Sequence, residues 1–431
     1  MKKENLRRYF QFLLVVLAAG AIFPLIYLKT NYQETMLEIF NMTLPQLNNI
    51  YSILGMVFVV GYFPSGLLSD KFSAKKLLAV SLFGTAMGGF WFAQVPSYSS
   101  VVLIFCIWGT FSVFTFWSSH MKIVKLLAKS NEEGKFFGIL DGGRGVVEAL
   151  LASFALLIFS GILGASLEFA DKRAALVGVI YMYSIVLLVV SILIFIFVED
   201  DKQLISDSEE EVIKTKFKIS DVIKLFKNKY VYLHGGIIFM GYAVFWTVYY
   251  LGGFLQSNIG IDPVTVSTIM VIVLWMRPVG GFVGGYLADK IGKTATISGA
   301  LVGAGVCLTS AAILPVTTAP VIFYAVIILL GAFLYAIRGT YWSLLGESKI
   351  DVAIMGTAIG VISFIGYLPD IILPQFNSFL FSTFGDNGGY NAYFIATAII
   401  GLVGVVIAFV YNRLNKKEKI RLAKLEVAEE V

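Results

Sequence analysis

The chain has 431 residues, of which 58% are hydrophobic and only 14% are charged, and its mean hydropathy is +0.82. Soluble domains contain about 45–50% apolar and about 25% charged residues, so this composition excludes an ordinary soluble domain and favours a protein embedded in a lipid bilayer. The net charge of +5 is modest and comes mostly from loops and tails, so it does not indicate nucleic-acid binding.

Long apolar runs dominate the chain, and a helix that spans a bilayer needs about 20 mostly apolar residues. Runs of this kind precede a long hydrophilic segment at 9–28, 47–69, 76–95, 101–126, 135–163 and 175–198. They resume after it at 230–255, 264–288, 294–314, 320–345, 353–380 and 390–412. We therefore predict an all-α membrane protein with twelve transmembrane helices in two six-helix halves.

The hydrophilic segment separates the two predicted halves. It is acidic at first and basic later, and its second part is typical of a short amphipathic helix on the membrane surface. The predicted organisation is an N-terminal half, a cytoplasmic linker, a C-terminal half and a cytoplasmic tail, over 1–198, 199–229, 230–412 and 413–431.

The distribution of Lys and Arg predicts that both termini are cytoplasmic, because cytoplasmic loops carry an excess of these residues. With this orientation the outer loops hold only Lys29, Lys172 and Arg173. The cytoplasmic side holds the basic groups of the linker and of the tail, together with Lys2, Lys3, Arg7, Arg8, Lys71, Lys75, Lys76, Lys122, Lys125, Lys129, Lys135, Lys290, Lys293 and Lys349.

A short motif occurs once in each half, directly after its second apolar run. The first copy is GLLSDKFSAKK, from Gly66, and the second is GYLADKIGKT, from Gly285. The pair resembles the signature of the major facilitator superfamily, G-x-L-a-D-r-x-G-r-k, although Ser73 replaces a glycine in the first copy. The resemblance covers nearly the whole chain and implies transport by two parallel repeats.

The resemblance also implies a cytoplasmic gating loop, in which the motif's Asp meets a helix N-terminus in the outward-facing state. A carboxylate is favourable at the positive end of a helix, and such a contact can break when the halves rock. The matching positions are Gly66, Asp70, Lys71, Gly285, Asp289 and Lys290.

The eighth run, WMRPVGGFVGGYLADKIGK, is similar to helix 8 of nitrate/nitrite porters, oxalate/formate antiporters and monocarboxylate transporters. In those families an Arg on this helix contacts an anionic substrate, and Arg277 is the matching residue. At about 1.5 Å per residue, Arg277 lies about 18 Å from Asp289, near the middle of the bilayer. The structural alternative is an ion pair with Asp370 or Glu148. The second run lacks the Arg that nitrate porters carry, which favours an organic anion over nitrate.

The fifth run contains GILDGGRGVVEALL, in which Asp141, Arg144 and Glu148 share one helical face. Two acids and one base leave one carboxylate that can carry a proton or a cation. An ion-pair ladder that stabilises this helix is the structural alternative. Aligning the halves through Gly138 and Gly360 places Glu148 opposite Asp370, so we predict charge or proton coupling at these carboxylates. For Asp370 a helix break at Pro369 is the alternative.

Polar groups on the tenth and seventh runs complete the predicted substrate site. Arg338 lies in the inner third of the tenth run and either binds a second anionic group or pairs with Glu347 near the surface. The superfamily resemblance implies that helices 1, 4, 7 and 10 line the central cavity, so Tyr335 and Trp246 are candidate substrate contacts.

The sequence predicts no cofactor, no metal and no enzymatic activity, since no P-loop, dinucleotide fingerprint or metal-ligand spacing is present. The leading hypothesis is a secondary transporter of a small organic anion, a carboxylate or sulfonate, in the cytoplasmic membrane. It works by alternating access, with possible proton coupling or exchange, and functions as a monomer. The alternatives are a facilitator of a neutral or cationic solute, such as a sugar or drug, and a non-transporting sensor of the same fold.

Overall fold

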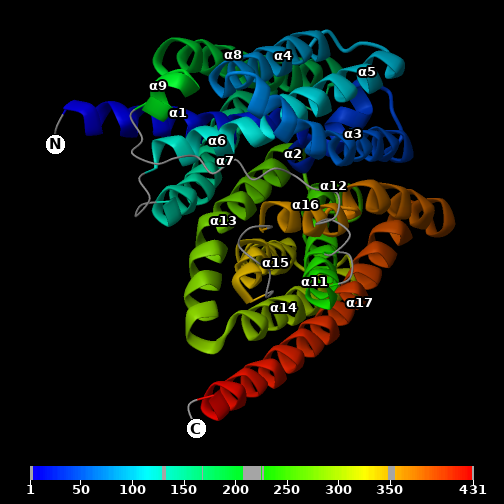
Figure 1. Cartoon of the computed structure of the whole chain (residues 1–431). Coiled ribbons are helices and arrows are strands. Elements are labelled where there is room, and N and C mark those ends of the chain that lie inside the picture. Colours follow the sequence, from blue (N-terminus) through cyan, green and yellow to red (C-terminus); the bar gives the residue numbers. More distant parts are fainter. Residues whose placement is uncertain are drawn as a thin grey trace. The chain divides into compact units, whose positions relative to one another are not determined.

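The computed structural model describes residues 3–128, 133–166, 168–206, 225, 228–347 and 355–429, and the regular structure in these ranges is helical (Figure 1). The elements before the linker are α1 (Lys3–Ile26), α2 (Lys29–Ile39), α3 (Leu44–Lys71), α4 (Ala74–Phe92), α5 (Tyr98–Gly109), the π-helical turn η1 (Thr110–Thr115), α6 (Trp117–Leu127), α7 (Glu133–Leu163) and α8 (Phe169–Phe197), and α9 (Asp201–Ser206) lies within the predicted linker. Those after it are α11 (Lys229–Phe245), α12 (Val248–Ser257), α13 (Pro263–Ile291), α14 (Lys293–Ile313), α15 (Pro320–Thr340), the 3-10 helix η2 (Tyr341–Glu347), α16 (Met355–Gly366) and α17 (Pro369–Glu429).

The chain folds into two compact units, and the first of them draws on both sequence halves. The first unit comprises Met1–Ile213, Tyr249–Pro278 and Asp370–Gly389, and the second comprises Lys214–Val248, Val279–Pro369 and Tyr390–Val431. Helices α13 and α17 are therefore divided between the units. Most of the predicted linker, 199–229, lies outside the described residues.

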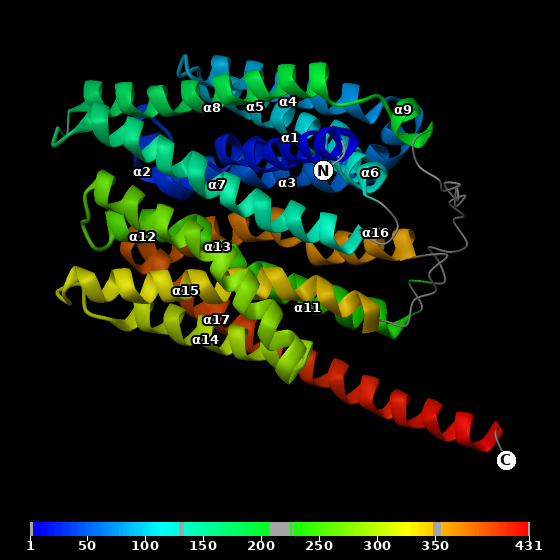
Figure 2. The same ribbon diagram turned by 90° about the vertical axis from the view of Figure 1, so that its left-hand side faces the viewer.

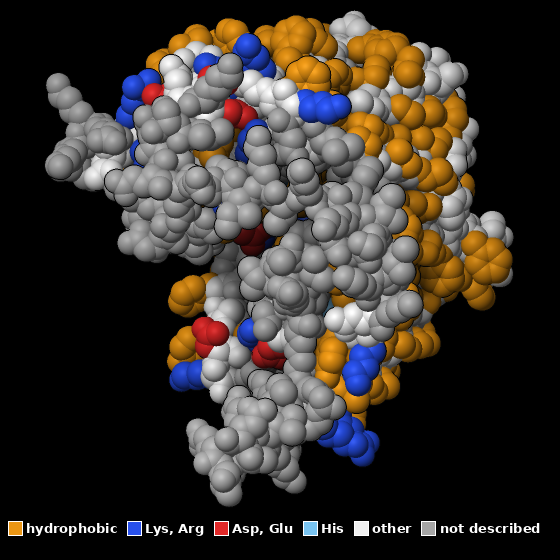
Figure 3. All heavy atoms as spheres, in the orientation of Figure 1, with side chains coloured by type: hydrophobic (Ala, Val, Ile, Leu, Met, Phe, Trp, Pro, Cys, Tyr) orange, Lys and Arg blue, Asp and Glu red, His pale blue; other side chains and the backbone are white. Residues whose placement is uncertain are grey.

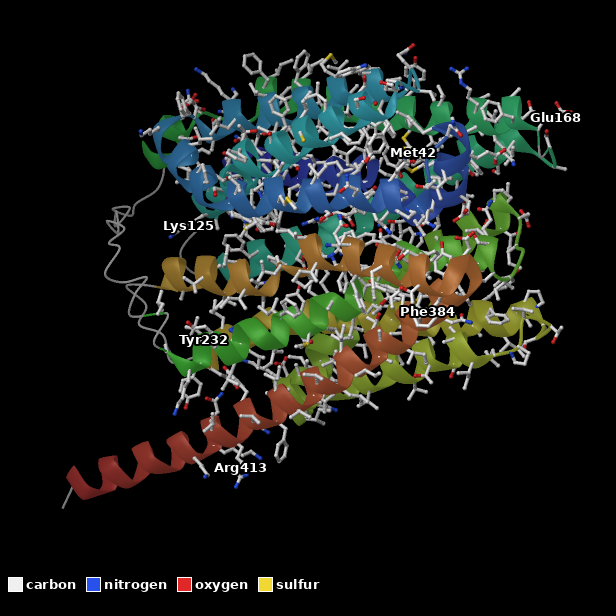
Figure 4. The ribbon with its side chains drawn as sticks, turned by 90° about the vertical axis from the view of Figure 1, so that its right-hand side faces the viewer. Met42, Lys125, Glu168, Tyr232, Phe384 and Arg413 are labelled. Carbon is white, nitrogen blue, oxygen red and sulfur yellow. The ribbon has the colours of Figure 1, made fainter. Side chains whose placement is uncertain are left out.

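In the first unit the long helices pack side by side. α4 lies against α8, and α1 packs against both α7 and α8 (Figure 2). Met42, Glu168 and Phe384 lie at one end of this unit and Lys125 lies at the other (Figure 4). In the second unit α14 packs against α15, and α11 packs against α16. The helices thus cross each unit from end to end, as membrane-spanning helices do.

Among the described residues, eleven helices are long and apolar enough to cross a membrane. The predicted run 76–95 corresponds to α4, which is 19 residues long but is not one of the eleven. α4 begins with two lysines, Lys75 and Lys76, and is rich in small residues, and both features lower its hydropathy. The structure therefore supports the all-helical membrane fold without confirming a count of twelve.

Apolar side chains remain exposed along the outer faces of these helices. On α4 they recur at helical spacing, at Val80, Phe83, Met87 and Trp91. α8 exposes Ile185, Val189, Ile192, Phe195 and Ile196 in the same way. Apolar side chains gather at the top of Figure 3, over the part of the first unit that these two helices form. A continuous apolar surface of this kind suits contact with lipid.

Two predicted spans are interrupted in the structure, and the sequence explains the second interruption. The run 101–126 is divided by the π-helical turn between α5 and α6, and such turns are often found at functional sites. The run 353–380 is divided where α16 ends at Gly366 and α17 begins at Pro369. Proline disfavours helical geometry in the residue before it and is well suited to a first helical turn, so the break follows from the sequence.

Helix α13, which carries Arg277, begins with a side-chain cap. Asp262 Oδ1 accepts hydrogen bonds from the amides of Val264, at 3.1 Å, and Thr265, at 2.9 Å. Partial burial on its own would raise the pKa of the Asp262 carboxyl, but hydrogen bonds from Thr265 and the Val264 amide outweigh it and lower the pKa below its ordinary value. The cap therefore anchors the start of α13.

Gly20 sets the distance between α1 and α7. A Cβ atom at Gly20 would lie 2.5 Å from Val147 Cβ and 3.0 Å from the Arg144 carbonyl oxygen. We expect Gly20→Ala to lower the free energy of unfolding by about 1–3 kcal/mol, because the two helices must move apart. Thermal unfolding in detergent measures the effect.

Gly142→Ala is the matched control, because an added Cβ at Gly142 on α7 meets nothing within 4 Å. This substitution is expected to leave the protein as stable as wild type or slightly more stable, since alanine favours the helix. Equal midpoints for the two variants would show that Gly20 does not determine the packing of α1 on α7.

Candidate functional site

Three charged side chains meet inside the first unit, between α7 and α13. Arg144 Nε donates to Glu148 Oε1 at 2.8 Å, and Arg277 Nη1 donates to Glu148 Oε2. The Glu148 and Arg277 side chains are each only 11% exposed. One buried carboxylate is therefore held between two guanidiniums, and we call Arg144, Glu148 and Arg277 the arginine–glutamate cluster.

Local sequence explains how α13 approaches α7 at this point. An added Cβ at Gly145 would lie 3.0 Å from Arg277 Cδ and 3.1 Å from its Cγ. The absence of a side chain at Gly145 thus leaves the space that the aliphatic stem of Arg277 occupies. Arg144 and Glu148 are four residues apart, so they lie on the same face of α7, and the Arg144 guanidinium also packs 4.7 Å from the Phe23 ring centroid.

Asp141, which the sequence places on the same helical face as Arg144 and Glu148, lies at the exposed edge of the cluster. Its carboxylate lies 3.7 Å from Arg277 Nη2, and its side chain is 76% exposed. An ion pair this open to solvent contributes little energy. The structure therefore brings Asp141 near Arg277, but it separates the buried acid Glu148 from the exposed acid Asp141.

The charges of the cluster determine what it can bind. Its two guanidiniums carry two positive charges and Glu148 carries one negative charge, so the buried part of the site has a net positive charge. A guanidinium is a planar donor that can hold a carboxylate or similar oxyanion through two hydrogen bonds. The arrangement is therefore suited to binding an anion that competes with Glu148.

Asp370 lies elsewhere in the first unit, in the first turn of α17. It is buried, and its backbone packs against α3, where an added Cβ at Gly55 would lie 2.6 Å from the Asp370 carbonyl oxygen. Asp370 also interacts electrostatically with Tyr27. Of the two predicted partners for Arg277, the structure pairs it with Glu148, and Asp370 stands beside the helix break at Pro369.

The remaining predicted contacts belong to the second unit. Arg338 lies with its Cζ 4.5 Å from the Phe245 ring centroid, and Tyr335 packs edge-on against the same ring at 5.5 Å. Trp246 is buried at the end of α11, which suits packing. The structure thus brings Arg338 and Tyr335 together around Phe245.

The sequence profile of the Major Facilitator Superfamily matches residues 9–374, most of the chain. The chain belongs to the Major Facilitator Superfamily. It is therefore a multi-pass membrane transporter and not an enzyme.

Related proteins and solved structures match this chain over nearly its whole length. The chain is similar to two proteins of Escherichia coli strain K12. The inner membrane protein YqcE is 28% identical, over 96% of this chain and 97% of the YqcE chain, and the inner membrane protein YihN is 27% identical, over 97% of this chain and 98% of the YihN chain. A bacterial homologue of the lysosomal transporter Spinster, in an inward-facing and unoccupied conformation, matches with a TM-score of 0.75 at 12% identity, over 97% of this chain and 98% of that one. The nucleoside transporter NupG matches with a TM-score of 0.70 at 15% identity, over 94% of this chain and 98% of that one. These structures show the shared fold.

The two copies of the superfamily motif include several exposed residues in this structure. An added Cβ at either Gly66 or Gly285 meets nothing within 4 Å. Lys71, Asp289 and Lys290 are exposed, whereas the Asp70 side chain lies outside the described residues. The gating role of these loops stays a prediction.

A carboxylate that the motif did not indicate lies at the start of α4. Asp201 of α9 accepts a hydrogen bond from the Ala74 amide at 2.9 Å and forms an ion pair with Lys122 at 2.7 Å. The Asp201 carboxylate, on the helix that follows α8, therefore lies at the positive N-terminus of α4. Its place in the EDD run after the sixth span is a signal that could have indicated it.

Sequence reasoning also missed Lys29, which it assigned to an outer loop. The structure places Lys29 at the first position of α2, fully buried. Its ammonium lies 4.2 Å from the Tyr51 ring centroid and 4.3 Å from that of Tyr250. The segment YLKTNYQ places Lys29, Thr30, Asn31 and Gln33 directly after an apolar run, so hydropathy alone predicted an exposed loop.

Proposed function

We propose that this protein is a secondary transporter of a small organic anion of the carboxylate or sulfonate type. The observation that carries the proposal is the arginine–glutamate cluster, in which Glu148 is held between Arg144 and Arg277. Ionisable groups at membrane depth are costly and are usually functional. A site with two guanidiniums and one buried acid has a positive charge left for a substrate anion.

The substrate anion would take the place of the Glu148 carboxylate on Arg277. Binding would be favoured when Glu148 accepts a proton, because the neutral acid no longer competes for the guanidinium. Anion and proton would then cross together, and reopening of the site on the other side would release both. Without a proton, one anion would instead exchange for another, with Glu148 filling the site between them.

The remaining predicted residues have secondary roles in this proposal. Arg338 and Tyr335 would contact the substrate from the second sequence half, and Trp246 would support them through packing. Asp141 would balance charge at the exposed edge of the cluster, and Asp370 would contribute to coupling as a buried acid in the first turn of α17. The motif loops would gate the cytoplasmic side.

We also propose the orientation and location predicted from the sequence: twelve spans, both termini in the cytoplasm, in the cytoplasmic membrane, working as a monomer. The exposed apolar stripe of α4 supports its assignment as the twelfth span. The Lys and Arg bias supports the orientation, and the inner membrane relatives support the location.

Uptake into proteoliposomes tests the proposal. The purified protein is screened with small carboxylates, sulfonates, nitrate and sugars, each with and without an imposed pH gradient. We expect saturable uptake of an organic anion, stimulated by an inward proton gradient if the coupled scheme holds. Uptake of a neutral solute, unaffected by Arg277→Gln, would reject the anion proposal and favour a facilitator of neutral solutes.

A further inference from the structure

Lys29 is enclosed by tyrosines from two parts of the chain that are far apart in sequence. The box consists of Tyr51 on α3 together with Tyr249 and Tyr250 on α12, and the Lys29 ammonium lies 4.2, 5.7 and 4.3 Å from their ring centroids. Lys29, Tyr51 and Tyr250 are almost completely buried. We call these four residues the tyrosine box. Aromatic ring faces attract a cation, and this attraction is strongest where water is excluded.

The box is continuous with a buried polar chain. The Tyr250 hydroxyl donates to Asn48 Oδ1 at 3.0 Å, and Asn48 Nδ2 donates to Asn377 Oδ1 at 2.8 Å. Ser52, four residues after Asn48, donates to the Ile371 carbonyl at 2.8 Å. The chain therefore joins α12 and α17, which come from the C-terminal half of the sequence, to α3 of the N-terminal half.

The backbones also approach closely beside the box. An added Cβ at Gly252 on α12 would lie 2.8 Å from the Thr30 carbonyl oxygen, next to Lys29. Ser267 Oγ on α13 lies 3.2 Å from the Asn31 carbonyl oxygen. All of these contacts lie inside the first compact unit. They join helices that belong to the two superfamily repeats.

We propose that Lys29 is a gating residue and that the tyrosine box is the outer gate of the transporter. Superfamily transporters rock their two halves about a central site, so contacts that join the halves at one end must break when that end opens. With the proposed orientation, the end of α1 next to Lys29 faces outward. Opening this end would withdraw Lys29 from Tyr249 and Tyr250 and return its ammonium to water.

Removing the lysine and removing a tyrosine ring are expected to have opposite effects on the opening of the gate. A buried cation is costly, and replacing it with an apolar residue of similar size often stabilises the buried state. Loss of a ring instead leaves the cation buried with less compensation. Lys29→Met should therefore favour the closed gate, and Tyr250→Leu should favour the open gate.

A cysteine reporter measures opening without any transported substrate, so the test does not depend on the anion proposal. Ser52→Cys is introduced after Cys106→Ser and Cys307→Ser remove the native cysteines. Ser52 is fully buried beside α17 and would become accessible when α17 separates from α3. The rate of labelling by a membrane-impermeant maleimide added from outside reports the open population.

We expect Tyr250→Leu to raise the labelling rate about tenfold and Lys29→Met to lower it about tenfold, each corresponding to about 1.4 kcal/mol. In the Lys29→Met background, Tyr250→Leu should change labelling by less than about threefold, because no cation remains for the ring to stabilise. Lys29→Arg keeps the cation and should label close to the wild-type rate. Tyr250→Phe keeps the ring but removes the hydrogen bond to Asn48, so it should label faster than wild type and more slowly than Tyr250→Leu.

Two results would overturn the proposal. Labelling of Lys29→Met at the wild-type rate would remove the lysine from the gate, and this variant alone decides the question if Tyr250→Leu does not reach the membrane. An equal effect of Tyr250→Leu in both backgrounds would show that Tyr250 acts through its packing and its hydrogen bond to Asn48, and not through the Lys29 ammonium.

Discussion

Arg277→Gln is expected to reduce uptake of the substrate anion by at least about 30-fold, since loss of a buried charged hydrogen-bonding partner removes about 2 kcal/mol or more of binding free energy. The Gln side chain is shorter, carries no charge and cannot form the bidentate pair. The protein should still fold, because Glu148 keeps its hydrogen bond from Arg144. Initial uptake rates in proteoliposomes, normalised to protein amount, measure the loss.

A double substitution separates substrate binding from a purely structural ion pair. If Arg277 serves only to neutralise Glu148, then Arg277→Gln combined with Glu148→Gln removes both partners and should restore transport. If Arg277 binds the substrate, the double variant should remain as slow as Arg277→Gln alone. Restored uptake in the double variant would therefore contradict the assigned role of Arg277.

Glu148→Gln is expected to have the second large effect, on stability and on coupling. Removing the acid leaves the Arg144 and Arg277 guanidiniums buried without their shared counter-charge, which typically destabilises a protein by about 3–5 kcal/mol. An added substrate anion should recover much of this loss, so it should raise the unfolding midpoint of Glu148→Gln more than that of wild type. The response of uptake to a pH gradient should also disappear, because the proposed proton acceptor is gone.

Asp141→Asn is the matched control for Glu148→Gln. It removes one negative charge from the same helix near the same guanidinium, but the Asp141 side chain is 76% exposed and lies 3.7 Å from Arg277. Its effect on the unfolding midpoint should be small, since exposed pairs contribute at most about 1 kcal/mol. Similar destabilisation by both substitutions would show that burial of Glu148 is not what makes the cluster sensitive.

Much of the fold could be predicted from local patterns. The apolar runs coincide with long helices such as α8 and α14, because a bilayer requires about 20 apolar residues whatever the neighbours are. The run 76–95 forms the helix α4 as expected, yet its lysines and glycines give it a weaker membrane signal. The break before Pro369 was also readable, because proline restricts the residue before it.

The site was predicted less completely, because its partners are distant in sequence. Spacing alone placed Arg144 and Glu148 on one face of α7, and the structure confirms their ion pair. The choice between Glu148 and Asp370 for Arg277 stayed open, since nothing in either segment measures the distance between α7, α13 and α17. The close approach at Gly145 decides it.

By itself, the sequence determined that this is a helical membrane transporter of the Major Facilitator Superfamily, and it predicted Arg277, Glu148 and Asp370 as charged residues within apolar runs, because hydropathy, charge bias and signature motifs are local properties. Only the tertiary structure decided that Arg277 shares the Glu148 carboxylate with Arg144 and that Lys29 lies inside a box of tyrosines. These contacts join residues such as Glu148 and Arg277, which are 129 positions apart. The energies of these contacts depend on helix packing and burial, and neither can be read from a single segment of the chain.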